Sequence, residues 1–228
     1  MDKEVGKAIS AFKSGRPVMI YDSDYREMET DLLWHAAAAT PEVIRRLRND
    51  CGGLLFLAIG NEIGEMFGLP WLQDIHSHES LVEENPVLGH LITNDLQYDS
   101  RSAFTLSLNH RETYTGITDR DRSLTTRRFG ELSRELIEKG EDGARAKESL
   151  GKEFRTPGHI PVCRESPGGL KTRQGHTELA VSIARLAGLA ACTIGAEMLE
   201  PEGDGALSLE GARTVSYTHL TLPTNREV

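Results

Sequence analysis

The segment HTELAVSIARLAGLAACTIGAEML, residues 176–199, joins a helical pattern to a buried strand. In its first half Leu179, Ile183 and Leu186 recur at helical spacing, and Gly188 is placed to end the helix. The second half, AACTIGAEML, is a short apolar run typical of a strand inside a sheet. A helix that leads into a buried strand predicts a layered fold in which helices cover a sheet.

Outward from this segment, helical and extended patterns alternate without a strict strand–helix–strand period. The predicted strands are VMIYD (18–22), GGLLFLAIG (52–60), AFTLSLNH (103–110) paired with TYTGIT (113–118), and EFRTPGHIPVCRES (153–166). The predicted helices are VGKAISAFKSG (5–15), ATPEVIRRLRND (39–50), NEIGEMFG (61–68), DRDRSLTTRRFGELSRELIEKG (119–140) and a start at SLEGAR (208–213). Residues 73–100 lack periodicity and are predicted to be a loop. The expected fold class is α+β, a mixed β-sheet with helical layers in a single domain.

Composition narrows the functional classes. The 228 residues are 38% hydrophobic and 27% charged, which suits one globular domain. No apolar run approaches the ~20 residues that span a bilayer, and the polar, acidic N-terminus predicts no targeting segment. The three cysteines lie far apart, so we expect a reducing, cytoplasmic location. A net charge of −9 argues against a nucleic-acid partner but leaves room for a small anion in a local basic pocket.

Five carboxylates crowd into DSDYREMETD, residues 22–31, directly after an apolar strand: Asp22, Asp24, Glu27, Glu29 and Asp31. Such a cluster at a strand end suits Mg²⁺, which prefers oxygen ligands. An EF-hand is excluded, because its fifth and sixth positions would be Arg26 and Glu27 and its twelfth would be Leu33. From the residues alone, a solvated acidic turn is an equal alternative to a metal site.

A second candidate is TRQGHTE, residues 172–178, where a Gly-rich loop runs into a helix start. Free backbone amides and the helix dipole favour phosphate at such an end, and Arg173 and Thr177 lie beside it. His176 could bind a metal or transfer a proton. The alternative is an ordinary helix start, with Thr177 as N-cap and Arg173 in solvent.

Two further residues stand out by context. Glu197 lies within the apolar strand pattern, and a buried carboxylate costs several kcal/mol unless it is paired or functional. His159 follows a Pro-Gly turn in RTPGHIPV, and taken alone it suggests only a surface histidine.

Five separated blocks together resemble one family. DSDYREMETD, NHRETYTGITDRDRS, FRTPGHIPV, TRQGHTE and GAEM follow the order and approximate spacing of 3,4-dihydroxy-2-butanone 4-phosphate synthase, in its single-function, archaeal-type form. The resemblance covers roughly residues 5–213. It implies an enzyme of riboflavin biosynthesis that converts D-ribulose 5-phosphate into 3,4-dihydroxy-2-butanone 4-phosphate and formate.

The resemblance also assigns roles to residues. It implies that Glu27 and His176 are ligands of Mg²⁺, with Mn²⁺ as an alternative ion. The substrate-binding positions that it implies are Arg26, Glu27, Asp31, Arg173, Gly175, Thr177 and Glu197. Catalytic roles fall on His159, Glu197 and Glu29. Two departures are Met28, where the family often has Asn or Gly, and the absence from GGLLFLAIG of a cysteine that some members carry.

These roles suit the implied lyase chemistry. The metal would stabilise an enediolate, and carboxylates whose pKa values are raised by crowding would transfer protons. The resemblance further implies a homodimer with the site near the subunit interface. One alternative is a divergent phosphosugar isomerase that uses the same enediolate chemistry. The other is a non-catalytic nucleotide- or RNA-binding module of related fold, whose typical basic surface this acidic chain lacks.

The last segment differs in composition from the rest. VSYTHLTLPTNREV, residues 215–228, resembles the translation of a sequencing adapter, so we expect the domain to cover residues 1–213 and to be C-terminally truncated. The alternative is a genuine, frayed terminus.

Overall fold

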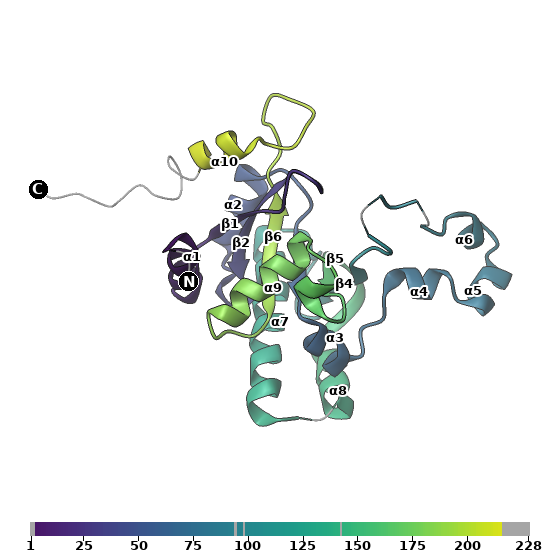
Figure 1. Cartoon of the computed structure of the whole chain (residues 1–228). Helices are drawn as coiled ribbons and strands as arrows, with labels where there is room; N and C mark the ends of the chain where they lie inside the picture. Colours follow the sequence, from purple (N-terminus) through teal and green to yellow (C-terminus); the bar gives the residue numbers. More distant parts are fainter. Residues whose placement is uncertain (1–2, 94, 98, 142, 216–228) are drawn as a thin grey trace, which may run out of the picture.

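A six-stranded mixed sheet organises the chain, in a computed structural model that describes residues 3–93, 95–97, 99–141 and 143–215 (Figure 1). The strands are β1 Val18–Tyr21, β2 Thr30–His35, β3 Phe56–Ile59, β4 Phe104–His110, β5 Phe154–Arg164 and β6 Cys192–Glu197. Their order is β1-β2-β6-β3-β5-β4, and β3 and β5 are parallel while the other neighbours are antiparallel. The predicted mixed sheet is confirmed, and the strand of the opening segment, β6, lies inside it.

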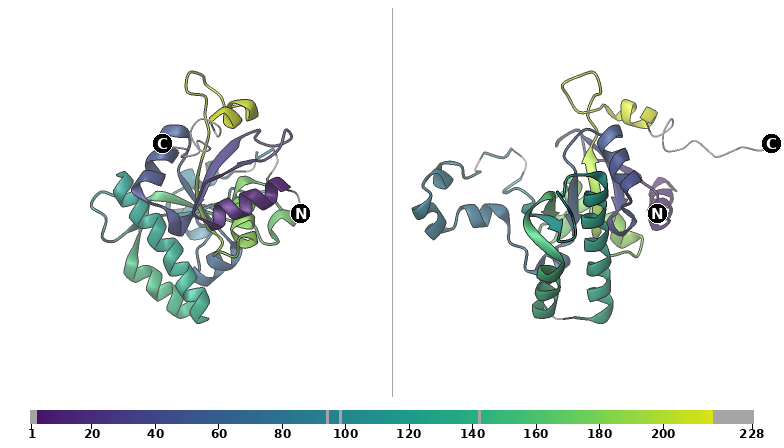
Figure 2. Two further views of the ribbon diagram at one scale, coloured as in Figure 1. Left: turned by 90° about the vertical axis from the view of Figure 1, so that its left-hand side faces the viewer. Right: turned by 180° about the vertical axis from the view of Figure 1, so that it is seen from behind.

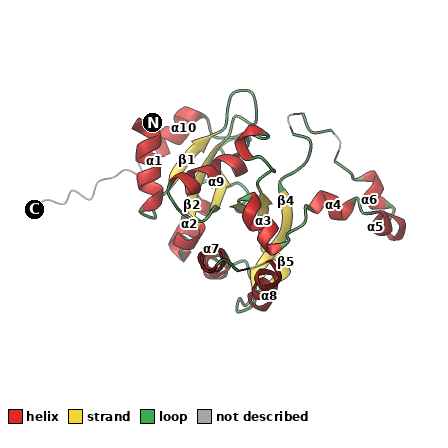
Figure 3. Cartoon of the chain, turned by 60° about the horizontal axis from the view of Figure 1, so that its bottom comes forward, coloured by secondary structure: helices red, strands yellow, loops and turns green. Residues whose placement is uncertain are grey.

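Helices cover both faces of the sheet (Figure 3). The longer helices are α1 Lys3–Lys13, α2 Pro41–Asp50, α3 Asn61–Phe67, α7 Asp119–Lys139, α8 Gly143–Glu153, α9 His176–Leu186 and α10 Leu209–Val215. α9 lies in front of β6 in Figure 1 and contacts α1, whereas α7, with α2 beside it, lies on the far side and faces the viewer in the right panel of Figure 2. The predicted helical layers are confirmed. Within the described residues, no helix has the length and apolar character that crossing a membrane requires.

Local signals explain where the confirmed helices start and stop. Thr40 accepts a hydrogen bond from the Val43 backbone amide and caps α2, with Pro41 at the first helical position. The longest of the described helices, α7, ends before Gly140, which adopts the left-handed backbone (φ +61°) typical of a helix C-terminus.

Two strand predictions are wrong. TDLLWH was not predicted to be a strand, yet β2 covers Thr30–His35 and is buried throughout, so the acidic stretch ends inside the sheet. TYTGIT does not pair with β4, whose partner is β5. Instead, the backbone amides of Thr115 and Gly116 donate to the Asp121 carboxylate, which fixes this segment as the entry loop of α7.

The region predicted to be a loop forms an arm that extends from the sheet (Figures 1 and 2). It contains the short helices α4 Leu72–His76, α5 Glu79–Glu84 and α6 Val87–His90. Helix α8 was not predicted either. The buried face of α9 includes Ala180, Val181 and Ala184 beside Ile183, while Leu186 is 60% exposed, so the predicted apolar face was partly misplaced.

The C-terminal helix α10 begins where SLEGAR predicted a helix, and it continues to Val215. Ala212 is buried and Val215 packs against the core, so packing continues to the end of the described chain. The predicted artefact at 215–228 lies otherwise outside the described residues and stays a prediction, as does the domain end at 213.

Candidate active site

A cavity of about 230 Å³ opens at one end of the sheet, where β2, β3, β5 and β6 meet the N-terminus of α9. The acidic turn after β1 and the connection from α6 to β4 complete its wall. Among the predicted site residues, Glu27, Asp31, Arg173, His176, Thr177 and Glu197 line it. Segments that are far apart in sequence therefore form one site.

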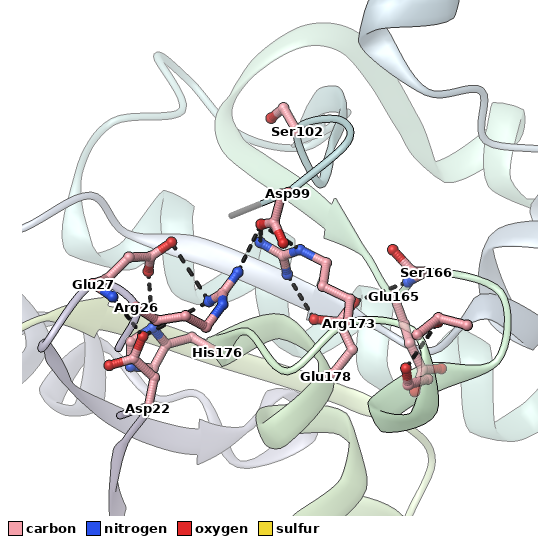
Figure 4. A network of polar contacts seen from close by, with 12 residues as sticks. Asp22, Arg26, Glu27, Asp99, Ser102, Glu165, Ser166, Arg173, His176 and Glu178 are labelled. Carbon is pink, nitrogen blue, oxygen red and sulfur yellow. Dashed lines mark hydrogen bonds and ion pairs between the residues drawn. The ribbon is translucent and has the colours of Figure 1, made fainter. Parts of the chain in front are cut away.

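Three side chains in this cavity region form a group that could hold a metal ion. One ligand atom each from Asp22, Glu27 and His176 lies within 4.8 Å of the others. His176 Nδ1 is 3.3 Å from Glu27 Oε2, and its Nε2 is 3.1 Å from the Glu29 carbonyl oxygen (Figure 4). A proton on Nε2, donated to that carbonyl, leaves the Nδ1 lone pair for a cation. The donor set of two carboxylates and one imidazole therefore fits a divalent ion.

The acidic turn is solvated only in part: Asp24 and Met28 are exposed, but Asp22 is not. The Asp22 side chain is fully buried and accepts hydrogen bonds from the backbone amides of Glu27 (2.9 Å) and Glu29 (3.2 Å). Between these two amides Met28 has φ +56°, a left-handed conformation that favours Asn and Gly. The Asp22 carboxylate therefore helps to hold the backbone at Met28 in its left-handed conformation. In the sequence, Asp22 stood out only as one of five clustered acids.

Asp31 and Glu197 face each other across the antiparallel pair β2 and β6. Asp31 is fully buried, and neither carboxylate oxygen has a hydrogen-bond partner among the described residues. Burial raises the pKa of Asp31 well above its usual value, although His176 opposes the shift. Burial also raises the pKa of Glu197 and of Glu29, where the charge of Glu27 adds to the effect. Each of these carboxyl groups therefore holds its proton to a higher pH than an ordinary carboxyl group does.

His176 has the opposite electrostatic environment. Burial lowers the pKa of its imidazole, but the hydrogen bond with Glu27 and the negative charges of Asp31 and Asp22 outweigh burial and raise the pKa to about 9. The histidine is thus a site of strong cation preference, whether the cation is a proton or a metal ion.

Two guanidinium groups lie at this site: Arg173 is part of the cavity lining, and Arg26 lies beside Asp22 and Glu27 on the acidic turn. Arg173 contacts the Glu178 carboxylate through Nη1 (2.6 Å), and Arg26 lies 3.6 Å from Glu27. Gly175 allows this approach, because a Cβ atom there would lie 2.4 Å from Arg173 Nη1 and 2.8 Å from Arg26 Nη1. The two arginines predicted to bind substrate are therefore brought together.

Helix α9 does not have Thr177 as its N-cap, as the alternative interpretation of this segment predicted. Gly175 is the N-cap, His176 is the first helical residue, and Thr177 lies buried in the first turn. Thr177 therefore does not cap the helix, and its side chain lines the cavity instead.

Arg26, Glu29 and Gly175 adjoin or contact lining residues without being part of the cavity lining, and His159 is not part of the lining either. It is exposed on β5, where its backbone amide donates to Asn109 Oδ1 (2.9 Å). Its Nδ1 also lies 3.1 Å from Asn109 Nδ2. On this chain, therefore, His159 is not brought together with Glu197 and Glu29.

Sequence reasoning missed several residues that line the cavity, among them Asp99 and Cys163. Asp99 reaches it from the connection between α6 and β4, which carried no recognisable pattern. Cys163 of β5 also lines it, while Phe56 stands in β3, the strand where some relatives were expected to carry a cysteine. Burial raises the pKa of Cys163 to about 12, so this group is a neutral thiol.

A mixed sheet that brings together carboxyl groups with raised pKa values, a group that could hold a metal ion and two arginines defines a metal-dependent enzyme that acts on an anionic substrate. The sequence profile of 3,4-dihydroxy-2-butanone 4-phosphate synthase matches residues 6–223. The chain belongs to this family, as its motifs predicted, and the match extends past the domain end expected at residue 213.

Individual relatives agree. The chain is 38% identical to 3,4-dihydroxy-2-butanone 4-phosphate synthase of Methanothermobacter thermautotrophicus over 94% of this chain and 89% of that one. It is 40% identical to the enzyme of the same name from Archaeoglobus fulgidus, over 90% and 84%. A solved structure of a synthase of this name in complex with two magnesium ions superposes with a TM-score of 0.69 at 25% identity, over 93% of this chain and 88% of that chain.

Proposed function

We propose that this chain is a Mg²⁺-dependent lyase that converts D-ribulose 5-phosphate into 3,4-dihydroxy-2-butanone 4-phosphate and formate, a step of riboflavin biosynthesis. The observation that carries the proposal is that Glu27 and His176 of the metal-binding group, the cross-strand pair Asp31 and Glu197, and Arg173 all line one cavity. Membership in the synthase family supports it. No observation favours the alternative isomerase or the nucleotide-binding module.

The arginines, the metal-binding group and the carboxyl groups would each take a part of the chemistry. Arg173 and Arg26 would bind the phosphate by charge-assisted hydrogen bonds, with Gly175 and Thr177 shaping the first turn of α9 around it. The carbon chain would then lie toward the buried carboxyls. Asp22, Glu27 and His176 would hold the divalent ion, which, when bound, stabilises negative charge on neighbouring substrate oxygens.

Proton transfers fall to groups whose pKa values suit them. A carboxyl group that holds its proton near neutral pH can act as an acid, and after losing the proton it can act as a base. The pKa values of Asp31, Glu197 and Glu29 are raised in this direction, so these three residues are the proposed acids and bases. Each well-placed group of this kind contributes about 10²–10⁴-fold to rate.

The quaternary structure and the ion stay proposals. A homodimer, with a second copy contributing His159 to this cavity, would give that residue the catalytic role that its position on its own chain does not explain. Mn²⁺ is proposed as an alternative to Mg²⁺, because both are hard ions suited to carboxylate ligands. A cytoplasmic location is proposed because all three cysteines are free thiols in the structure.

The direct test is incubation of the purified protein with D-ribulose 5-phosphate and Mg²⁺, with formate measured by a coupled dehydrogenase. We expect one formate for each ketose phosphate consumed, and loss of formate release on removal of the metal with a chelator. Consumption of the ketose phosphate without formate would contradict the lyase and favour the isomerase.

A further inference from the structure

A carboxylate from outside the sheet lies between the two cavity arginines (Figure 4). Asp99 Oδ2 is 2.6 Å from Arg26 Nη2 and 2.8 Å from both Nε and Nη2 of Arg173. The Asp99 side chain is only 9% exposed. We call the pair of guanidinium groups on Arg26 and Arg173 the cradle. A single carboxylate oxygen therefore binds both members of the cradle.

Asp99 is not required to orient the cradle. Arg173 is already held through Nη1 by Glu178, whose side chain is fully buried in the first turn of α9. Arg26 lies beside Asp22 at 3.7 Å and Glu27 at 3.6 Å on its own turn. Each arginine thus has a carboxylate neighbour on the acidic turn or on α9. Asp99 is an additional carboxylate beside the cradle.

The electrostatics disfavour a second anion while Asp99 remains. Among the described residues, the two cradle cations contact four carboxylates: Asp22, Glu27, Asp99 and Glu178. A phosphate group with nearly two negative charges would meet the negative charge of Asp99 at the same two guanidinium groups that it needs. Three of the four carboxylates belong to the acidic turn or to α9. Asp99 alone of the four lies on the connection between α6 and β4, so it is the one whose withdrawal leaves the rest of the site in place.

We propose that the Asp99 carboxylate is an internal occupant of the cradle, which the phosphate group of the substrate displaces on binding. The identity of that substrate rests on the proposed function. A phosphate offers several oxygens and more charge than a carboxylate, so it makes stronger bidentate contacts with guanidinium groups. Asp99, being tethered, competes at a high effective concentration.

The consequence is specificity for a complete phosphosugar. Free inorganic phosphate has only the cradle to bind, and it must displace Asp99 without further gain. A phosphorylated ketose also reaches the metal-binding group and the buried carboxyls, and those contacts offset the displacement. Asp99 therefore selects against free phosphate, an abundant anion that would otherwise block the site.

The test is phosphate binding in the absence of turnover. Inorganic phosphate is titrated calorimetrically into the full-length Mg²⁺-loaded protein, comparing wild type with Asp99→Asn and Asp99→Ala. We expect both variants to bind phosphate about tenfold more tightly, the size of one charge-assisted hydrogen bond. Asp95→Asn, the same charge change at an exposed residue of the same connection, should leave the phosphate Kd unchanged. Adding Arg173→Ala to Asp99→Asn should abolish the gain.

Weaker or unchanged phosphate binding in both Asp99 variants, with thermal melts like that of wild type, would overturn the proposal. Weaker binding would show that Asp99 positions the arginines. The result does not depend on formate release. If Asp99→Asn tightens phosphate binding but the wild-type protein releases no formate, Asp99 competes with phosphate for the cradle and the proposed reaction is wrong.

Discussion

At the scale of single residues, the site contains side chains whose pKa values are shifted from the ordinary ones by burial and by neighbouring charges. Asp31 is fully buried without a hydrogen-bond partner among the described residues, and His176 is held between carboxylates that raise its pKa to about 9. An uncompensated buried charge costs several kcal/mol, so such groups persist where a ligand or a proton compensates them. The two residues therefore indicate where a cation and a transferable proton belong.

The metal group gives the first residue-scale prediction. Glu27→Gln and His176→Ala should each abolish formate release and weaken Mn²⁺ binding, used as a spectroscopic probe, by at least about tenfold, because each removes one donor of the group. Circular dichroism should show a folded protein. Tyr21, a half-buried residue of β1 whose hydroxyl donates to Asp24 beside this turn, supplies the control: Tyr21→Phe should leave Mn²⁺ binding unchanged. Near-wild-type Mn²⁺ affinity in either ligand variant would show that the ion binds elsewhere.

The strained turn gives the second. Met28 is 56% exposed, so its side chain contributes little packing, while its φ of +56° costs about 1–2 kcal/mol for an ordinary L-residue. Met28→Asn, a residue that tolerates this region, should raise the free energy of unfolding by about 0.5–1 kcal/mol in urea denaturation. A decrease would mean that the methionine side chain has a packing role that its exposure does not show.

At the scale of secondary-structure elements, the start of α9 positions the cradle. The helix begins at His176 because Gly175, with an extended backbone (φ −89°, ψ 173°), precedes it, and Gly175 has no side chain to displace the arginines. One short stretch thus supplies the histidine of the proposed metal-binding group, the approach of two guanidinium groups and the cavity-lining Thr177.

A methyl group at that position gives the third prediction. Gly175→Ala should raise the KM for ribulose 5-phosphate at least about tenfold, since the new Cβ would meet Arg173 and Arg26 at 2.4–2.8 Å and displace their flexible ends. Its melting temperature should change little, because the backbone angles suit alanine.

Gly151→Ala in α8 is the matched control. No atom lies within 4 Å of its new Cβ, so it should leave KM unchanged and stabilise the helix by about 0.5–1 kcal/mol. An unchanged KM in Gly175→Ala would show that the close approach of the arginines is not needed for binding.

At the scale of the whole molecule, the sheet carries chemistry at one end and a buried histidine toward the other. His35 of β2 lies 6% exposed and donates from Nε2 to the Ala190 carbonyl at 3.0 Å. Burial lowers the pKa of this imidazole, the charge of Arg134 lowers it further, and the hydrogen bond opposes the shift in part. In the folded state His35 therefore stays neutral to a lower pH than an ordinary histidine does.

The fourth prediction is the pH dependence of stability that follows. Above the unfolded pKa of about 6.5, His35 is neutral in both states and its contribution to stability is complete. As pH falls below about 6.5, the unfolded chain binds a proton first, so stability is lost by up to about 1.4 kcal/mol per pH unit until the lowered folded pKa is reached. His35→Gln, whose amide can also donate to Ala190, should show a smaller loss of stability between neutral and acidic pH than wild type.

The exposed His90 supplies the comparison on the arm. His90→Gln should keep the wild-type slope in chemical denaturation followed across this pH range. Equal slopes for wild type and His35→Gln would show that other titrations dominate.

The sequence by itself determined the elements with local signals and the family. Thr40 and Pro41 started α2, Gly140 ended α7, and the motifs assigned Glu27 and His176 to a shared metal site. These features are readable because caps, periodicity and motif spacing act over a few residues.

Only the tertiary structure decided what depends on long-range pairing. β2 has a mixed polar and apolar sequence and is a strand because it pairs between β1 and β6, which also places Asp31 opposite Glu197. Glu27 and His176 are 149 residues apart in the chain, and Asp99 and Arg173 are 74 apart. No local pattern encodes such contacts, since they form only when sheet order and helix packing bring distant segments together.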